Sequence, residues 1–159
     1  MSMAFQIKPV RTELEIAAAA KLLERYAASL PVDLDYQDFN SELASLPGEY
    51  SPPHGELLLA WDEARNPLGC VALRRIQPGG CCEMKRLFVT PRARGLGLGR
   101  AIVQAIIERA RRLGYGELRL DTLPGMDAAI GMYEQIGFKR IGAYYAPTPS
   151  GTIFMSLKL

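Results

Sequence analysis

The sequence predicts an α/β (α+β) fold, a single domain over residues 1–159 with a mostly antiparallel central sheet of about seven strands and four helices. Three observations support this prediction. Three strand-like apolar segments follow one another with short turns between them. An amphipathic helical pattern follows a glycine-rich segment. A short strand, a helix and two more strands then close the chain. A chain of 159 residues can bury a full core without a disulfide or a metal.

The N-terminal third is predicted to hold one strand and two helices. Apolar residues near the start indicate a short strand: Phe5, Ile7 and Val10. Thr12, followed three residues later by Glu15, has the form of a capping box, which predicts a helix that runs to about Ser29 and is stopped by Pro31. The acidic stretch 33–46 is predicted to be helical. The first third therefore precedes most of the sheet.

The middle of the chain is predicted to form an antiparallel meander. Residues 47–55 contain three prolines and two glycines, which favour a loop. Three strands are then predicted, at 56–61, 68–76 and 82–90, with turn-forming residues between them. Pro91 ends the third strand. This order places three neighbouring strands before the glycine-rich segment.

The last third is predicted to alternate helices and strands. After the segment 95–99, apolar residues recur at the spacing of one helical face: Ile102, Val103, Ile106, Ile107, Ala110 and Leu113. A strand is predicted at 117–121 and a helix at 127–135. Two final strands are predicted at 138–145 and 153–159.

Composition excludes several classes of protein. The chain is 48% hydrophobic and 23% charged, which does not fit a disordered, collagen-like or coiled-coil chain. The formal net charge of +2 hides an uneven distribution. Residues 1–73 hold 5 basic and 11 acidic side chains, residues 74–119 hold 11 and 3, and residues 120–159 hold 3 and 3. A basic block therefore lies in the middle of the chain.

The cysteines and the first residues bear on location. Cys70, Cys81 and Cys82 are odd in number and lack the spacing of a zinc site, so we interpret them as reduced thiols. The first residues soon reach Lys8 and Arg11 without an apolar run long enough for a signal peptide or a membrane span. We expect a cytoplasmic protein that binds neither membrane nor metal.

The strongest functional signal is the glycine-rich loop at 95–99. A strand ends, a turn without side-chain bulk follows, and a helix begins. Glycines at alternate positions let backbone N–H groups surround one object, and the helix N-terminus adds partial positive charge. Arg92, Arg94 and Arg100 flank the loop. This pattern predicts a pyrophosphate site.

Spacing separates the possible phosphate ligands. A Walker loop needs Lys and then Ser or Thr after its last glycine, whereas Arg100 and Ala101 follow Gly99 here. A dinucleotide fingerprint needs G-x-G-x-x-G, and this chain has G-x-G-x-G, although Asp121 stands about 20 residues on. Three antiparallel strands before the loop also leave no room for a six-stranded parallel sheet. A plain glycine turn without a ligand stays open as an alternative.

Two motifs together resemble the GNAT superfamily of acyl-CoA-dependent N-acetyltransferases. The family's R/Q-x-x-G-x-G/A loop is matched by Arg94, Gly97 and Gly99. Its second signature, a tyrosine followed after three residues by Gly-Phe, is matched by Tyr133, Gly137 and Phe138. The resemblance covers residues 55–159 well and the first 50 residues only in their order of elements. Members often have Asn seven residues before the tyrosine, where this chain has Met126.

The resemblance implies how acetyl-CoA binds. The third meander strand is expected to splay from its neighbour, so that the backbone of Leu87 and Val89 pairs with the pantetheine arm, and the pyrophosphate is expected on the N–H groups of residues 96–100. The cofactor-binding residues implied are Leu87, Phe88, Val89, Arg94, Gly95, Leu96, Gly97, Leu98, Gly99 and Arg100. The acetyl group is expected to pass directly to the acceptor amine, without an acyl-enzyme.

Tyr133 and Glu83 are the predicted catalytic residues. The resemblance implies that the Tyr133 hydroxyl points at the cofactor sulfur, and a phenol is protonated at neutral pH and can donate to the departing thiolate. Its position also suits a core residue of its helix. Glu83 is the predicted base, with a solvated edge-strand carboxylate as the alternative. Asp121 is a second choice for the base, and a helix cap or a structural acceptor is the plainer interpretation of it.

The other candidates are assigned ordinary roles. His54 lies in the proline-rich loop, where an exposed position is expected. Cys81 and Cys82 have no histidine partner in the pattern of a nucleophile and are interpreted as apolar filler. Tyr144, Tyr145 and the turn 147–151 are interpreted either as a lining of the acceptor pocket or as a plain hairpin connection.

The acceptor is predicted to be a small-molecule or peptide amine that the sequence does not identify. Four acidic residues of the N-terminal third could attract a cationic amine or form a solvated face: Asp33, Asp35, Asp38 and Glu42. A non-catalytic acyl-CoA-binding module is the alternative function. Nucleic-acid binding is not expected, because the arginines flank a phosphate loop or lie on an amphipathic helix. The oligomeric state is left open, a homodimer included.

Overall fold

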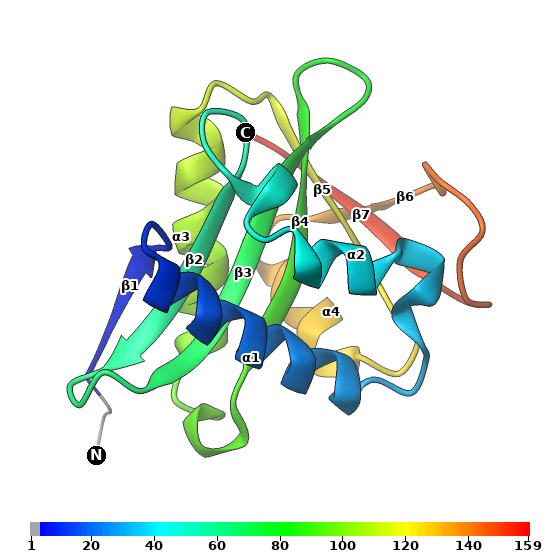
Figure 1. Ribbon diagram of the computed structural model, residues 1–159. Coiled ribbons are helices and arrows are strands. Elements are labelled where there is room, and N and C mark those ends of the chain that lie inside the picture. The colour runs from blue at the N-terminus through cyan, green and yellow to red at the C-terminus, as the bar shows by residue number, and fades with distance from the viewer. Residues whose placement is uncertain (1–3) are drawn as a thin grey trace.

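The computed structural model describes residues 4–159, and within them the chain forms seven strands and four α-helices (Figure 1). The strands are β1 Phe5–Pro9, β2 Glu56–Asp62, β3 Pro67–Ile76, β4 Cys81–Val89, β5 Glu117–Thr122, β6 Lys139–Ile141 and β7 Ile153–Lys158. The helices are α1 Glu13–Ser29, α2 Phe39–Ala44, α3 Leu98–Arg112 and α4 Asp127–Ile136. The predicted fold class is confirmed.

One sheet forms the centre of the molecule, in the order β1-β2-β3-β4-β5-β7-β6. Every neighbouring pair is antiparallel except β4 and β5, which are parallel. Helices α1 and α2 cover one face, and α3 and α4 lie on the other (Figure 1). Each face of the sheet carries its own apolar cluster, because successive side chains of a strand point to opposite faces.

Helices α1 and α3 form where the capping box and the apolar periodicity predicted them. The Thr12 side chain accepts from the N–H of Glu15, and the Glu15 carboxylate accepts from the N–H of Thr12, which is the predicted capping box of α1. The apolar face of α3 is buried from Leu98 to Ala110, whereas Leu113 is 39% exposed. The periodic pattern therefore identified the packed face but extended it one turn too far.

Two predicted elements differ from the structure. The stretch 33–46 is divided into a 3-10 turn, Leu34–Gln37, and the short helix α2, because Asp38 between them has a positive φ of 56°. The predicted strand 138–145 is reduced to β6. Tyr144 and Tyr145 leave it and pack edge-on against Phe154, with ring centroids 5.1 and 5.5 Å away. Contacts between aromatic rings thus take the place of continued strand pairing here.

Strand β4 contains a β-bulge at its middle. Lys85 pairs with Ala72 and Phe88 pairs with Cys70, so the two residues Arg86 and Leu87 stand opposite one residue of β3. Arg86 has a φ of 62°. A bulge adds one residue to one strand and reverses the alternation of side chains beyond it.

Pairing between β4 and β5 covers only the first part of both strands. It joins Cys81 with Glu117 and ends where Glu83 pairs with Arg119. From there on the two strands separate, and their remaining residues face each other across a gap. This is the splayed pair that the family resemblance implied, and it opens the sheet between two parallel strands.

Candidate active site

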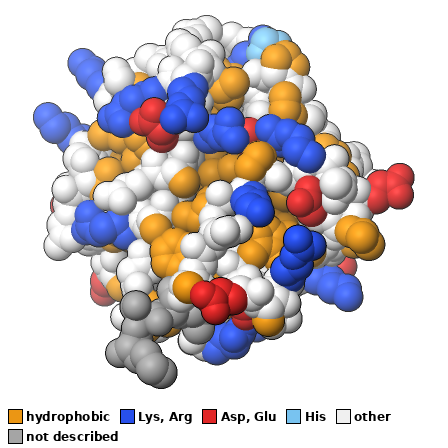
Figure 2. Space-filling model, turned by 90° about the vertical axis from the view of Figure 1, so that its left-hand side faces the viewer, with side chains coloured by type: hydrophobic (Ala, Val, Ile, Leu, Met, Phe, Trp, Pro, Cys, Tyr) orange, Lys and Arg blue, Asp and Glu red, His pale blue; other side chains and the backbone are white. Residues whose placement is uncertain are grey.

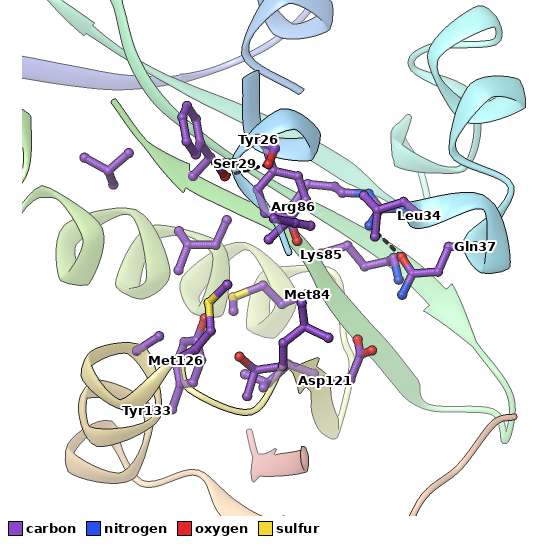
Figure 3. Close-up of a pocket in the computed structure, with 18 of the residues that line it drawn as sticks. Tyr26, Ser29, Leu34, Gln37, Met84, Lys85, Arg86, Asp121, Met126 and Tyr133 are labelled. Atoms are coloured by element: carbon purple, nitrogen blue, oxygen red, sulfur yellow. Dashed lines mark hydrogen bonds between the residues drawn. The ribbon is translucent and has the colours of Figure 1, made fainter. Parts of the chain in front are cut away.

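A cavity of about 250 Å³ lies where β4 and β5 separate, and we call it the central cavity. Residues of β4, β5, α1 and α4 line it together with the turn before α2. Figure 3 shows Met126 and Tyr133 on the α4 side, Tyr26 and Ser29 on α1, and Gln37 and Lys85 toward the opposite end. Its walls therefore come from segments far apart in the sequence.

The open edge of β4 presents backbone groups to this cavity. The N–H of Thr90 donates to the carbonyl oxygen of Leu68 at 2.9 Å, so Thr90 faces β3. Because backbone groups alternate along a strand, the N–H and C=O groups of Leu87 and Val89 face the other edge. Both residues line the cavity. Phe88 also lines the cavity, and its ring makes a T-shaped contact with Tyr26 of α1.

The glycine-rich loop forms the N-terminus of α3. Gly95 and Gly97 have φ values of 79° and 80°, which favour glycine, and Gly97 is the N-cap residue just before α3 begins at Leu98. No side chain of residues 4–159 caps this end, so the first N–H groups of α3 lack an internal partner. A Cβ on Gly95 or Gly97 would meet nothing within 4 Å, and one on Gly99 would meet only Val89, at 3.8 Å.

The flanking residues take different positions. The Arg94 Nε donates to the backbone oxygen of Val89 at 3.0 Å, which ties the loop to the end of β4. The Arg100 guanidinium donates to Gln135 at 2.5 Å. Leu96 is 43% exposed, whereas Leu98 is buried in the core, so only the backbone of Leu98 is available to a ligand.

These features fit a long ligand with a phosphate group. The open edge of β4 offers a hydrogen-bonding ladder for an extended arm, and the α3 N-terminus offers unpartnered N–H groups and partial positive charge for an anion. The glycines keep the approach to that helix end free of side chains. Coenzyme A has such an arm and such phosphates, and the residues present match it.

Tyr133 extends from α4 into the central cavity. Its ring packs on Phe138 with centroids 5.6 Å apart, and its hydroxyl makes no hydrogen bond to another of residues 4–159. Burial raises the pKa of the Tyr133 phenol above its ordinary value. The hydroxyl therefore stays protonated at neutral pH and has a proton to donate.

Glu83 is fully buried and does not line the central cavity. One carboxylate oxygen accepts from Arg74 Nε at 2.8 Å and the other from the Tyr144 hydroxyl at 2.6 Å. Burial favours a raised pKa, but Lys85, Arg74 and Tyr144 outweigh it, so the pKa of Glu83 lies below its ordinary value. This carboxylate is ionised and already engaged by neighbouring donors.

Asp121 is the carboxylate that lines the central cavity. It lies near the end of β5, just beyond the point where β4 and β5 separate. The Tyr145 hydroxyl donates to one of its oxygens, and Tyr145 in turn accepts from Gln37 Nε2 at 3.0 Å. The sequence had ranked this residue second to Glu83.

A second cavity, of about 380 Å³, adjoins the first, and we call it the side cavity. Residues of α2 and of the loops around it line this cavity, together with Arg74 of β3 and Lys85 of β4. Of the four acidic residues singled out in the N-terminal third, Asp38 and Glu42 are among its lining residues and Asp33 and Asp35 are not; Tyr145 lines it as well. Tyr36, Gln37 and Lys85 line both cavities, so the two spaces meet at these side chains.

A buried ion pair closes one wall of the central cavity. The Arg86 side chain is 2% exposed and donates to the two oxygens of Glu42 at 2.9 and 2.8 Å. The Nη1 of Arg86 donates to Gln37 Oε1 at 2.5 Å, and its guanidinium lies over the Phe39 ring, 5.2 Å from the centroid. The pair fixes α2 against the bulge of β4.

The other candidates lie outside the two cavities. The thiols of Cys70, Cys81 and Cys82 are buried, and burial raises the pKa of each. His54 is exposed, and its Nε2 lies 3.3 Å from Arg75. Among residues 4–159, no group of three or more His, Cys, Asp and Glu side chains could hold a metal ion. In the same range, no helix is both long and apolar enough to cross a membrane.

The basic block is only partly gathered at the glycine loop. Figure 2 shows the side on which β1 and α3 lie in Figure 1, where Lys and Arg side chains are mixed with apolar and acidic ones. On α3, Arg112 lies 3.3 Å from Glu108, and Arg109 lies 3.8 Å from Glu56. The Arg112–Glu108 pair is exposed, whereas Glu56 is buried, so both of these arginines of α3 already have a carboxylate neighbour.

Sequence reasoning missed Lys85 and Gln37, which line both cavities, and the Arg86–Glu42 pair. One signal was available. Lys85 and Arg86 are adjacent cations inside the otherwise largely apolar strand β4, where charged residues need partners or ligands. Gln37 and Glu42 carried no comparable signal, because their role depends on how the loops around α2 fold over β4.

Comparison with known proteins agrees with this geometry. The model of the acetyltransferase (GNAT) family matches residues 18–138. An uncharacterised N-acetyltransferase of Schizosaccharomyces pombe is 38% identical and covers 96% of this chain and 94% of its own length. One of Dictyostelium discoideum is 27% identical over 96% and 99%. The crystal structure of an acetyltransferase from Streptococcus agalactiae shares the fold, with a TM-score of 0.78, 22% identity and 98% of each chain covered. The chain belongs to the GNAT family of acetyltransferases.

Proposed function

We propose that this protein is an N-acetyltransferase that moves the acetyl group of acetyl-CoA directly to the amine of a small acceptor. One observation carries the proposal. The cavity between the separated ends of β4 and β5 holds both a protonated tyrosine hydroxyl and a carboxylate, and it is continuous with the open strand edge. Acid and base therefore face the same space.

Donor binding is assigned to the backbone. The backbone groups of Leu87 and Val89 on the open edge of β4 hold the pantetheine arm, and the N–H groups of residues 96–100 hold the pyrophosphate. Acetyl-CoA supplies an acetyl group activated as a thioester. This arrangement holds the thioester in the central cavity, so that an amine from the side cavity reaches it in a fixed orientation.

Tyr133 is proposed as the general acid. During transfer the amine nitrogen forms a bond to the acetyl carbon and the carbon–sulfur bond breaks, so the departing thiolate needs a proton. The Tyr133 hydroxyl opens into the cavity without another hydrogen-bond partner among residues 4–159. A general acid of this kind contributes about 10²- to 10⁴-fold to the rate.

For the general base, we propose Asp121 before Glu83. An amine must lose a proton to attack, and Asp121 lines the cavity whereas Glu83 is enclosed by Arg74 and Tyr144. Glu83, the residue predicted from the sequence, is then the anion that holds those two side chains in place. The two assignments make opposite predictions for single substitutions.

The test is release of free thiol from acetyl-CoA with a panel of amines. Acceptor-dependent release is expected, and Tyr133→Phe should lower kcat by at least about 100-fold with little change in acetyl-CoA affinity. Tyr115→Phe is the matched control, because its hydroxyl donates to the backbone of His54 away from both cavities. Tight acetyl-CoA binding without turnover on any amine would instead indicate an acyl-CoA-binding module.

The base is tested with Asp121→Asn and Glu83→Gln. If Asp121 is the base, its variant loses most of kcat at neutral pH while Glu83→Gln retains more of it. Loss of turnover in Glu83→Gln together with a nearly unchanged Asp121→Asn would return the role to Glu83. Calorimetric titration of acetyl-CoA into each variant separates lost chemistry from lost binding.

A further inference from the structure

Lys85 lies at the junction of the two cavities. It projects from β4 just before the bulge, and its side chain is 5% exposed. Figure 3 shows it running from the strand toward Gln37, which also lines both cavities. Lys85, Gln37 and Tyr36 therefore border the place where the two cavities meet.

The Lys85 ammonium lacks a hydrogen-bond partner among residues 4–159. Its nearest carboxylate oxygen belongs to Glu83, at 3.8 Å, which is beyond hydrogen-bond distance. Both oxygens of Glu83 already accept shorter bonds, from Arg74 and Tyr144. An ammonium group has three donors, and the charge of a largely buried side chain is normally paired and hydrogen-bonded.

The neighbouring cations differ from Lys85 in this respect. Arg86 is satisfied by Glu42 and Gln37, and Arg74 donates to both Glu83 and Glu49. Lys85 is thus the cation with unused donors at this junction. Its position suits an oxygen anion that enters with the acceptor.

Asp121 lies in the same cavity as Lys85 and carries the opposite charge. Burial is the largest influence on the pKa of Lys85 and lowers it, whereas the negative charge of Asp121 acts in the opposite direction. A cationic amine is attracted to the aspartate and an anionic group to the lysine. This pair of charges complements a molecule that carries an amine and a carboxylate.

We propose that Lys85 binds the carboxylate of the acceptor, so that the acceptor is an amino acid or a small amine with a carboxylate near it. The inference rests on the proposed acetyltransferase function and narrows it. A polyamine would bring a second cation against Lys85, where like charges repel. Lys85 is a residue that determines specificity, and the transfer chemistry belongs to other groups.

The experiment compares acceptors that differ only in the carboxylate. Leucine and 3-methylbutylamine form one pair, and phenylalanine and 2-phenylethylamine form another. In the wild type the carboxylate-bearing member of at least one pair should have the higher kcat/KM. Lys85→Met should lower its kcat/KM about 10- to 100-fold, as expected for a lost charged hydrogen bond, and change that of the plain amine less than threefold.

Two further variants sharpen the result. Lys85→Arg keeps a cation and should restore part of the preference, whereas a purely structural role would not link recovery to the carboxylate. Lys139→Met makes the same substitution at an exposed position of β6 and should change neither substrate. If Lys85→Met does not fold, the wild-type preference and Lys85→Arg still decide the question.

Failure of the inference is distinct from failure of the proposed function. Acetylation of plain amines equal to or faster than that of their carboxylate partners in the wild type would overturn the role of Lys85 and leave the acetyltransferase intact. An equal loss on both members of a pair in Lys85→Met would do the same. Binding of acetyl-CoA without acetylation of any amine would overturn both proposals.

Discussion

Replacing Glu42 with alanine tests how far a buried ion pair holds the site together. The substitution removes two hydrogen bonds, of 2.9 and 2.8 Å, from an Arg86 side chain that is 2% exposed. The guanidinium would keep Gln37 as an acceptor and the ring of Phe39 as a neighbour. It would also remain a charge in the interior without a counterion nearby.

The expected cost follows from that burial. Removing one partner of a buried ion pair costs about 3–5 kcal/mol. Because Gln37 and Phe39 still interact with the guanidinium, we expect the lower end, about 3 kcal/mol, for Glu42→Ala. For a domain of this size the melting temperature should fall by roughly 6–12 °C. Urea unfolding, followed by far-UV circular dichroism and by fluorescence of Trp61, measures the free energy of unfolding.

An exposed pair provides the control. Glu108 and Arg112 lie 3.3 Å apart on α3 with side chains 53% and 68% exposed, so Glu108→Ala should cost less than about 0.5 kcal/mol. The double variant Glu42→Leu with Arg86→Met removes both charges and should recover most of the lost stability. A loss for Glu42→Ala no larger than that of Glu108→Ala would refute the reasoning from burial.

Three further predictions concern the loop, the buried carboxylate and the thiols. Gly97→Ala should weaken acetyl-CoA binding about tenfold or more, and its positive φ should lower the free energy of unfolding by about 1 kcal/mol. Gly114→Ala, at a φ of 91°, should lose stability to a similar extent without losing acetyl-CoA affinity. Calorimetry measures the affinity and urea unfolding measures the stability. Because folding lowers the pKa of Glu83, the unfolded chain binds a proton at this carboxylate at a higher pH than the folded chain does, so the free energy of unfolding should decline as the pH falls below about 5. Glu83→Gln should flatten that decline in urea titrations from pH 6 to 3. A slope equal to that of the wild type would contradict the assignment. Burial raises the pKa of Cys70 and of Cys82 to about 12, so a disulfide reagent at pH 8 should label them only after unfolding, and rapid labelling of the native protein would show that they are accessible.

Features that depend on residues close together in the sequence were predictable. The capping box of α1, the apolar face of α3 and the turns of the meander depend on contacts within a few positions, so their residue types appear directly in the sequence. The glycine loop also belongs to this class, because Gly95 and Gly97 adopt a backbone conformation that few other residues tolerate. The predicted strand at 138–145 was too long, since only Lys139–Ile141 pairs and the tyrosines beyond it pack on Phe154 of another strand.

The order of elements, the glycine loop at the start of α3 and the family signature around Tyr133 all follow from the sequence alone. Which charged residues face the cavities depends on how the chain folds. Glu83 is enclosed by Arg74, opposite it on β3, and by Tyr144, which is 61 residues away. Asp121 and Lys85 face the central cavity because β4 and β5 separate beyond Glu83. Local pattern sets each backbone conformation, whereas exposure of a charge to a cavity depends on partners brought together from distant parts of the chain.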